Sequence, residues 1–437
     1  MSMTNTEQPE EPAESAPDAP LAMADMALSN EQDALTRAVA DWAERTDPAP
    51  LRRWLDRALD ADGVPKRQPV EAWWPALAAL AKARRRRLKY WPDDLDERLE
   101  GLARAALRFS RPDGSSAFDP QRGDPERLDL LKFWARRLDD PGLATVVRWW
   151  SDPGATVRRG LAPPPLPSFA CADRPLAVLR ADWSPKGDTL TIDGRKLGGS
   201  DRLELVGQGS HLLGPTWTPG PDSRPARALQ WTTGPLADLA EWTFRTSTGR
   251  VIRTAVLLKG ENLALLTDQH QAVSPEPMMR LALADGVEVT PNEEDRTLTL
   301  SAGRVKARLI PLALPGPGTS ADRGALTVEE QDVVLRQPAE GARSWLPLLI
   351  SWRAERNRKA LRLRKLTVTE RSKPCPPDIA VAFLVGWGLG DGLVIYRSLG
   401  RPGLRTFLGH QTSARFLVGQ FTKSGEVEPL VKLEDNA

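Results

Sequence analysis

The chain has 437 residues, of which 41% are hydrophobic and 27% are charged, a composition typical of a soluble globular protein with more than one domain. The net charge of +2 gives no general attraction to nucleic acid or acidic lipid, so neither is an expected partner. The two cysteines, Cys171 and Cys375, lie too far apart in sequence to suggest a disulfide framework. No apolar run approaches the roughly 20 residues of a membrane span, and no signal peptide is recognisable. A cytoplasmic location is therefore the default prediction.

Composition and periodicity divide the chain into four parts. Residues 1–28 contain six acidic residues and no Lys or Arg, which predicts a disordered acidic tail. Residues 29–160 have helical periodicity with Pro and Gly between the repeats, which predicts short stacked helical hairpins. Residues 161–175 are rich in proline and are predicted to be a linker.

The apolar period changes to two after the linker, so residues 176–437 are predicted to form a large antiparallel β-sandwich. Residues 237–267 illustrate the pattern, because alternating strands are joined there by two short turns into a three-stranded meander. A Pro-, Gly- and Ser-rich stretch at 311–325 could divide the sandwich into two sheet systems.

Residues that could carry chemistry are few. The only histidines are His211, His270 and His410, and the only tyrosines are Tyr90 and Tyr396. No two of them are close in sequence, so no metal site and no cofactor are predicted. His211 follows a glycine-rich turn, where a hydrogen-bonded surface residue is the ordinary interpretation and a base or ligand contact the alternative.

Tryptophan is abundant, with 15 copies. Trp183, Trp217, Trp231 and Trp242 fall in the first strands of the sandwich, where each could fill the core or stack on a sugar ring. Trp217 is the best candidate for a ligand contact, because the surrounding Gly214, Pro215, Pro219 and Gly220 suggest a loop.

Local sequences in the sandwich add to this layout. At 179–185 an Arg leads into an aromatic residue and a turn, and the strand at 253–258 is followed by one at 263–268 that ends in Asp. With the preceding helical hairpins, residues 95–300 resemble the heparinase II/III-like polysaccharide lyases. The resemblance implies a partial α/α toroid joined to the sandwich, and a groove for an acidic glycan between the two parts.

The chain departs from that family at 198–205, where the glycines and an acidic residue are present without the family's histidine. A uronate lyase needs a base for the C5 proton and an acid for the leaving oxygen. If the chain is a lyase, the resemblance leaves His211 and Tyr90 for these roles, with Arg180 neutralising the substrate carboxylate. The missing histidine favours a non-catalytic relative instead.

Two basic segments are candidate surfaces for anions. The run 84–87 ends a predicted helix, where cations stabilise the helix dipole. The denser segment 353–373 is predicted to be an exposed sheet face or a protected edge strand, with a surface for an anionic partner as the alternative.

Three functions remain open from sequence alone. The first is a non-catalytic protein that binds an acidic glycan or a protein partner through the helical/β cleft. The second is a divergent lyase acting on uronate-containing glycans, and the third is a structural or assembly protein without a small ligand. For the first, Arg180, His211 and Trp217 are predicted to converge on one concave surface, where Arg would pair with a carboxylate and Trp would stack on the ring. The sequence predicts no oligomeric state.

Overall fold

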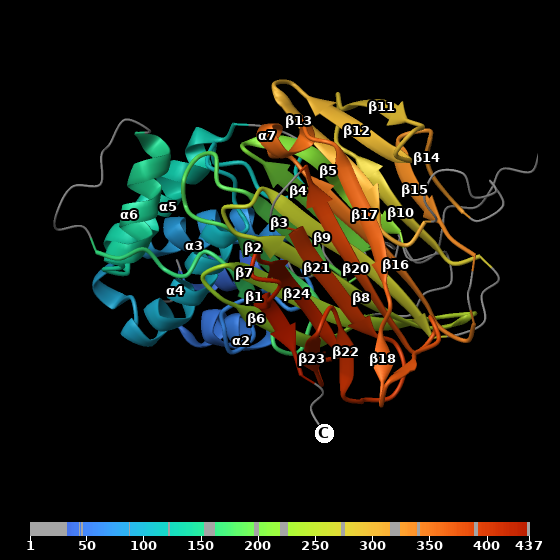
Figure 1. Cartoon of the computed structure of the whole chain (residues 1–437). Coiled ribbons are helices and arrows are strands. Elements are labelled where there is room, and N and C mark those ends of the chain that lie inside the picture. The colour runs from blue at the N-terminus through green and yellow to red at the C-terminus, as the bar shows by residue number, and fades with distance from the viewer. Residues whose placement is uncertain are drawn as a thin grey trace, which may run out of the picture.

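A computed structural model describes residues 33–42, 44, 47–86, 88–120, 123–152, 162–195, 201–218, 226–271, 276–314, 324–338, 341–388 and 392–434. Helices lie at one end of the molecule and stacked β-sheets form the rest (Figure 1). Within the described ranges, no helix is long and apolar enough to cross a membrane.

The helical domain contains five principal helices after the helical residues 33–42. They are α2 (Ala49–Ala58), α3 (Trp73–Arg86), α4 (Asp93–Arg108), α5 (Pro125–Arg137) and α6 (Pro141–Ser151), with short 3₁₀ turns at Val70–Ala72 and Leu88–Tyr90. The side chains of Asp124 and Asp140 cap α5 and α6, each of which has proline in its first turn. The inward faces form one core that includes Trp42, Trp73 and Trp134.

The first sheet lies next to the helices and has eight strands in the order β1-β2-β3-β4-β5-β10-β15-β14. The strands are β1 (Phe169–Ala170), β2 (Leu176–Arg180), β3 (Thr189–Asp193), β4 (Asp201–Gly207), β5 (Ser210–Thr218), β10 (Met278–Leu283), β14 (Ala325–Glu329) and β15 (Asp332–Arg336). Leu176, Val178 and Trp183 pack into the helical core, so the helical domain and this sheet share hydrophobic contacts.

The second sheet covers the other face of the first and also has eight strands, in the order β11-β12-β13-β16-β9-β8-β7-β6. The strands are β6 (Arg227–Thr233), β7 (Ala237–Thr246), β8 (Gly249–Leu258), β9 (Leu263–Gln271), β11 (Glu288–Asn292), β12 (Thr297–Ala302), β13 (Val305–Pro311) and β16 (Ser344–Ser351). Alternate residues of β9 point to opposite faces: Ala264 and Leu266 join the core shared with the first sheet, while Leu263 and Leu265 join the next core.

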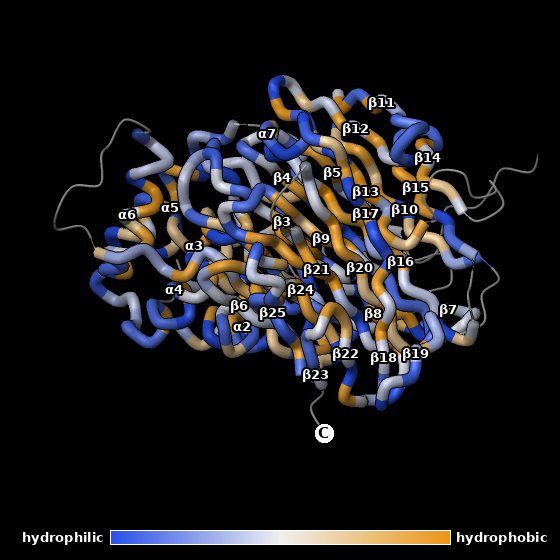
Figure 2. Tube along the Cα trace, viewed as in Figure 1, coloured by the Kyte–Doolittle hydropathy of each residue, from blue (hydrophilic) through white to orange (hydrophobic). Residues whose placement is uncertain are grey.

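Two further sheets lie beyond the second one: a five-stranded sheet covers it, and a small sheet covers the other face of the five-stranded sheet. The short helix α7 (Ala354–Asn357) leads into a five-stranded sheet in the order β17-β20-β21-β24-β25 and a small one in the order β19-β18-β22-β23. The first comprises β17 (Leu361–Leu366), β20 (Ala380–Trp387), β21 (Gly392–Ser398), β24 (Phe416–Phe421) and β25 (Val427–Leu433). The second comprises β18 (Thr369–Glu370), β19 (Lys373–Pro374), β22 (Arg405–Phe407) and β23 (His410–Thr412). Hydrophobic residues follow the strands through the stack (Figure 2).

The predicted order of a helical domain followed by a large antiparallel β-sandwich is confirmed. The additional sheets extend the sandwich beyond two layers, and the change to the outer layers comes after β16. Strand β1 lies within the proposed linker 161–175 and pairs with β2. The predicted tail 1–28 lies outside the described residues, as do residues 315–323 of the proposed boundary at 311–325.

The basic segment 353–373 forms α7 and β17, and β17 is the edge strand of its sheet. Arg362, Arg364 and Lys365 are exposed on it, which confirms the interpretation as a protected edge. Trp387 of β20 and the neighbouring apolar residues face the second sheet, while Ala380 and Ala382 face the small sheet. This strand is therefore covered on both faces.

Candidate functional site

A cavity of about 360 Å³ lies between the helical domain and the first sheet. The residues that follow α4 form one wall, and strands β2 to β5 form the opposite wall. We call this the interdomain cavity; the lining residues used below are Arg111, Trp150, Arg180, Glu204 and His211. Its volume is within the range typical of small-ligand sites.

Arg180 ends β2 and is almost completely buried, with 2% exposure. Its Nη2 donates to the carbonyl oxygens of Arg108 at 3.1 Å and Ser110 at 2.7 Å, at the C-terminal end of α4. A cation is stabilised there because the last carbonyls of a helix lack partners within the helix. Burial lowers the pKa of Arg180 to about 10, so the guanidinium remains charged at neutral pH.

The Arg180 guanidinium also lies 5.6 Å from the ring centre of Trp150 and 5.2 Å from that of Trp183. Its Nε is buried and has no hydrogen-bond partner among the described residues. A charged group with one unpaired donor in a ligand-sized cavity is a candidate contact for an anion, since buried donors are normally satisfied.

Glu204 of β4 is held by the helical domain. Arg111 donates to its carboxylate from both Nε, at 3.0 Å to Oε1, and Nη2, to Oε2, and the backbone N–H of Phe118 donates to Oε2 at 2.9 Å. Both carboxylate oxygens are thus occupied, and Glu204 is only 5% exposed. The bidentate pair fixes the helical domain against the sheet, and Glu204 is poorly suited to accept a substrate proton.

His211 lies near the start of β5 opposite Val206 of β4, and its side chain lines the cavity. The turn between the two strands is formed by Gln208 and Gly209, both with positive φ, as in a tight hairpin. Hydroxyl-bearing Thr189 and Thr191 of β3 line the same wall. The structure therefore brings Arg180 and His211 to one cavity.

Trp217 does not join them, and the expected loop position is wrong. It lies within β5, is 0% exposed, and packs edge to face against Trp242 with ring centres 5.6 Å apart. The Arg253 guanidinium lies 4.1 Å from its ring centre. A fully buried indole has no surface on which a sugar could stack, so Trp217 is a core residue.

The lyase pair His211 and Tyr90 is not brought together in this cavity. Tyr90 is 56% exposed in a 3₁₀ turn of the helical domain, and it is not among the described residues that line the cavity. Tyr396 is fully buried between the outer sheets and accepts a hydrogen bond from Arg405. In the described part of the chain, no tyrosine is therefore in place to protonate a leaving group beside His211.

Sequence reasoning missed three residues of the cavity, namely Arg111, Trp150 and Glu204. Trp150 supplies the aromatic wall that was expected of Trp217, and its Nε1 donates to the carbonyl of Trp183 at 2.9 Å. The signal available was the location of Arg111 and Trp150 at the ends of helices that face the sandwich.

The described residues contain no group of three or more His, Cys, Asp or Glu side chains arranged to hold a metal ion. Two guanidiniums and two carboxylates, those of Arg111, Arg180, Asp113 and Glu204, line the cavity. Their charges cancel, so the cavity lacks the field that concentrates a polyanion.

No protein-family model matches the sequence, and no curated protein is significantly similar to it. The fold is nevertheless similar to solved structures of helical-plus-sandwich proteins. The heparan sulfate lyase HepC from Pedobacter heparinus superposes with a TM-score of 0.60 and 13% identity over 86% of this chain. A heparinase III superposes with a TM-score of 0.58 and 12% identity over 88% of this chain. The protein thus has a heparinase-like fold.

The chain spans about two thirds of these relatives, 66% of the heparan sulfate lyase and 65% of the heparinase III. At such low sequence identity the similarity establishes the fold alone. The predicted resemblance to the heparinase II/III-like architecture is confirmed at that level.

Proposed function

We propose that this protein is a non-catalytic glycan-binding protein whose interdomain cavity takes a sugar with one carboxylate. The proposal rests chiefly on Arg180. This buried cation lines a ligand-sized cavity, and its Nε has no hydrogen-bond partner among the described residues. A carboxylate in the cavity would supply the missing acceptor by a charge-assisted hydrogen bond. His211, Thr189 and Thr191 offer further polar contacts on the sheet wall, and Trp150 offers an aromatic wall.

The balance of charge supports a short ligand. Because the Arg111–Glu204 pair is closed on itself, the attraction to a carboxylate comes chiefly from Arg180. The affinity should therefore depend on one acidic ring and fall little when salt is raised, in contrast to a polyanion held by many exposed cations. A protein partner is a weaker alternative at this position, since a stable protein interface buries about 800 Å² on each partner.

The lack of a tyrosine among the described residues that line the cavity supports binding without elimination. Glu204 is neutralised by Arg111, and neither described tyrosine lines the cavity. The lyase alternative rests on the fold and on His211, which does line the cavity. Elimination would produce an unsaturated uronate that absorbs in the ultraviolet, so incubation with heparin, heparan sulfate or alginate tests it directly. We expect no growth of absorbance.

Calorimetric titration with saturated uronate disaccharides tests the binding proposal. We expect one site per chain, and a loss of affinity of about tenfold in His211→Ala, the size expected for one lost polar contact. His410→Ala is the matched control, because His410 is also a half-buried histidine on a strand but lies in the outermost sheet. No binding by the wild type, or equal weakening by both variants, would contradict the proposal. Light scattering on the same samples tests the structural or assembly alternative, which requires a stable oligomer.

A further inference from the structure

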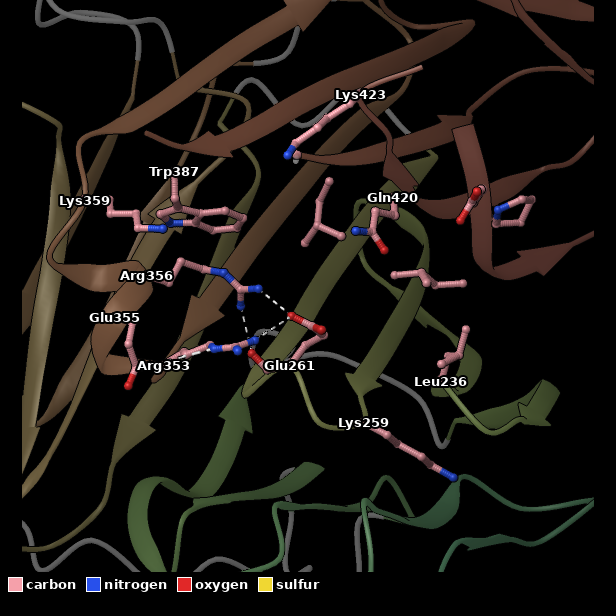
Figure 3. Close-up of a pocket in the computed structure, with 15 residues that line it drawn as sticks. Leu236, Lys259, Glu261, Arg353, Glu355, Arg356, Lys359, Trp387, Gln420 and Lys423 are labelled. Atoms are coloured by element: carbon pink, nitrogen blue, oxygen red, sulfur yellow. Dashed lines mark hydrogen bonds and ion pairs between the residues drawn. The ribbon is translucent and has the colours of Figure 1, made fainter. Parts of the chain in front are cut away.

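A second cavity, of about 520 Å³, lies at the seam between the second sheet and the five-stranded outer sheet. Figure 3 shows the side chains that surround it. One wall comes from the turn between β8 and β9 with Glu261, another from α7 with Arg353 and Arg356, and a third from the outer sheet with Trp387 and Lys423. We call it the basic cavity, because five Lys or Arg residues and three Glu residues are among its described lining.

Two guanidiniums are fixed on one side of this cavity by a shared carboxylate. Arg353 Nη1 lies 3.2 Å and Arg356 Nη2 2.5 Å from Glu261 Oε2, and Arg356 Nη1 donates to the Glu261 carbonyl at 2.7 Å. The Arg356 guanidinium also stacks 4.6 Å from the ring centre of Trp387 (Figure 3). Glu355 Oε2 lies 3.8 Å from Arg353 Nε on the same side. Two carboxylates and one carbonyl do not satisfy the ten N–H donors of two guanidiniums, so donors remain for a ligand.

Two lysines at the rim add positive charge, and Glu428 is the further acidic residue of the described lining. Lys359 follows α7 and Lys423 follows β24; both are exposed, and neither has an ion-pair partner among the described residues. Lys259, in contrast, is neutralised by buried Asp238 at 2.8 Å. The surplus cations of the basic cavity are therefore Lys359 and Lys423, on two different walls (Figure 3).

Trp387 provides a second, independent observation. Its ring lines the cavity, its side chain belongs to a residue only 7% exposed, and its buried Nε1 has no hydrogen-bond partner among the described residues. Leu236, Leu393 and Leu430 add an apolar surface beside it. An inorganic ion would not contact this apolar surface, whereas an organic anion with a ring the size of a sugar could pack against it.

We propose that the basic cavity binds an organic oxyanion, a phosphate or sulfate ester on a sugar-sized body. The ester oxygens would accept hydrogen bonds from the fixed guanidiniums and the two rim lysines, and the body would lie against Trp387 and the leucines. This site is separate from the interdomain cavity and does not depend on the function proposed for it.

Titration of the full chain with glucose 6-phosphate, glucose 6-sulfate and glucose at equal ionic strength tests the proposal. We expect one ester molecule to bind per chain, at least one of the two esters to bind in the millimolar range or tighter, and glucose not to bind. None of these probes has a carboxylate, so their binding is distinguishable from uronate binding between the domains. The stronger ester identifies the oxyanion.

The double variant Lys359→Ala/Lys423→Ala should weaken ester binding at least tenfold, because two charge-assisted contacts are lost. Lys82→Ala/Lys89→Ala is the matched control: it removes the same charge from two exposed lysines of the helical domain and should bind like the wild type. Both lysine pairs are exposed, so the variants should fold, which a thermal scan confirms. Absence of ester binding by the wild type, binding of glucose with equal affinity, or equal weakening in both double variants would overturn the proposal.

Discussion

A single guanidinium, that of Arg180, connects the end of α4 to the edge of the cavity. It satisfies two helix carbonyls with one nitrogen and leaves another nitrogen unpaired inside the protein. Sequence placed Arg180 correctly on the first strands, but could not show that its main partners are backbone carbonyls rather than Asp182. Asp182 instead accepts the backbone N–H of Ser184 at 2.7 Å, in the turn after β2.

Arg180→Ala should lower the free energy of unfolding by about 2–4 kcal/mol, because two buried carbonyl groups lose their donor. Urea denaturation measures this. Arg67→Ala, which removes an exposed arginine of the helical domain, should change stability by less than about 0.5 kcal/mol. A comparable effect in the two variants would show that Arg180 is not a structural link between helix and sheet.

Trp217→Ala should cost about 3–5 kcal/mol of stability, since it leaves a large cavity in the core between the first two sheets. Trp217→Phe should be milder and should keep the affinity for uronate ligands unchanged, because the residue contacts no solvent. A loss of affinity in Trp217→Phe without a loss of stability would restore the ligand-binding role that the sequence suggested.

The error over Trp217 has a physical cause within β5. Gly214 and Pro215 suggest a loop, but the strand continues through them, and Leu213 and Thr216 both pair with β4. On the other side, β10 pairs with Leu213 and Trp217 and shifts its register between them. The irregularity accommodates Pro215, which has no backbone N–H to donate to a neighbouring strand. Sequence alone does not reveal such a bulge.

At the scale of elements, buried ion pairs hold the sheets together. Arg253 of β8 donates to both oxygens of Asp268 on β9 at 2.8 Å, and to Asp201 on the first sheet at 2.8 Å. Glu241 of β7 joins the second sheet to the outer one through Arg397, at 2.8 Å, and Arg415. These contacts specify which faces meet, because each buried charge needs its partner from the neighbouring sheet.

Glu241→Gln should destabilise the protein by about 3–5 kcal/mol at neutral pH, since it leaves Arg397 and Arg415 without their counter-charge. Burial alone would raise the pKa of Glu241, but the guanidiniums of Arg397 and Arg415 outweigh it, and the pKa is lowered. Ionised Glu241 therefore stabilises the folded state fully above the unfolded-state pKa of about 4.3. This stabilisation is lost as the pH falls towards the lower pKa that Glu241 has in the folded state.

Denaturation at a series of pH values checks this assignment. The stability difference between wild type and Glu241→Gln should be constant from neutral pH to about 5 and should shrink below about 4.3. Glu355→Gln is the control, because Glu355 is exposed on α7 and should give a small difference at every pH. A difference that stays constant down to the acid transition would contradict the role of the Glu241 charge.

The elements that the sequence predicted well have a regular spacing of apolar residues. The meander β7-β8-β9 alternates cleanly, and β20 is apolar on both faces because it lies between two cores. The order of the sheets was not predictable, because it is fixed by pairs such as Arg397–Glu241 that are 156 residues apart. The cavity was predictable only in part: Arg180 and His211 lie on strands that the pattern indicated, whereas Arg111 and Glu204 are defined by their contact across domains.

On the scale of the whole molecule, the helices, first sheet, second sheet and outer sheets form one stack with a shared core at each boundary. The interdomain cavity lies at the boundary between the helices and the first sheet, and the basic cavity at the boundary between the second sheet and the five-stranded sheet. The Arg111–Glu204 pair crosses the first boundary beside the cavity, and Arg180 both joins the sheet to the end of α4 and lines the cavity. The proposed ligand would therefore bind to residues that also hold the helical domain on the sheet.

Because of this coupling, a uronate ligand should raise the temperature at which the helical domain and the first sheet separate. Ligand that binds only the folded state stabilises by about 2.7 kcal/mol at a concentration of 100 times its Kd. Glu204→Gln should lower the temperature of domain separation without ligand and should reduce the rise that the ligand causes. The reason is that the charged part of the bidentate contact with Arg111 is lost. Thermal scans with and without ligand measure the shift; a shift of equal size in Glu204→Gln would contradict the coupling.

A crystal structure of the protein with a saturated uronate disaccharide tests the central claim most directly, since it reports both the place of binding and the fate of the ligand. We expect an intact, saturated uronate in the interdomain cavity, with its carboxylate beside the Arg180 guanidinium and its ring beside Trp150 and His211. An unsaturated product in the cavity, or a ligand bound elsewhere while the cavity holds none, would contradict it.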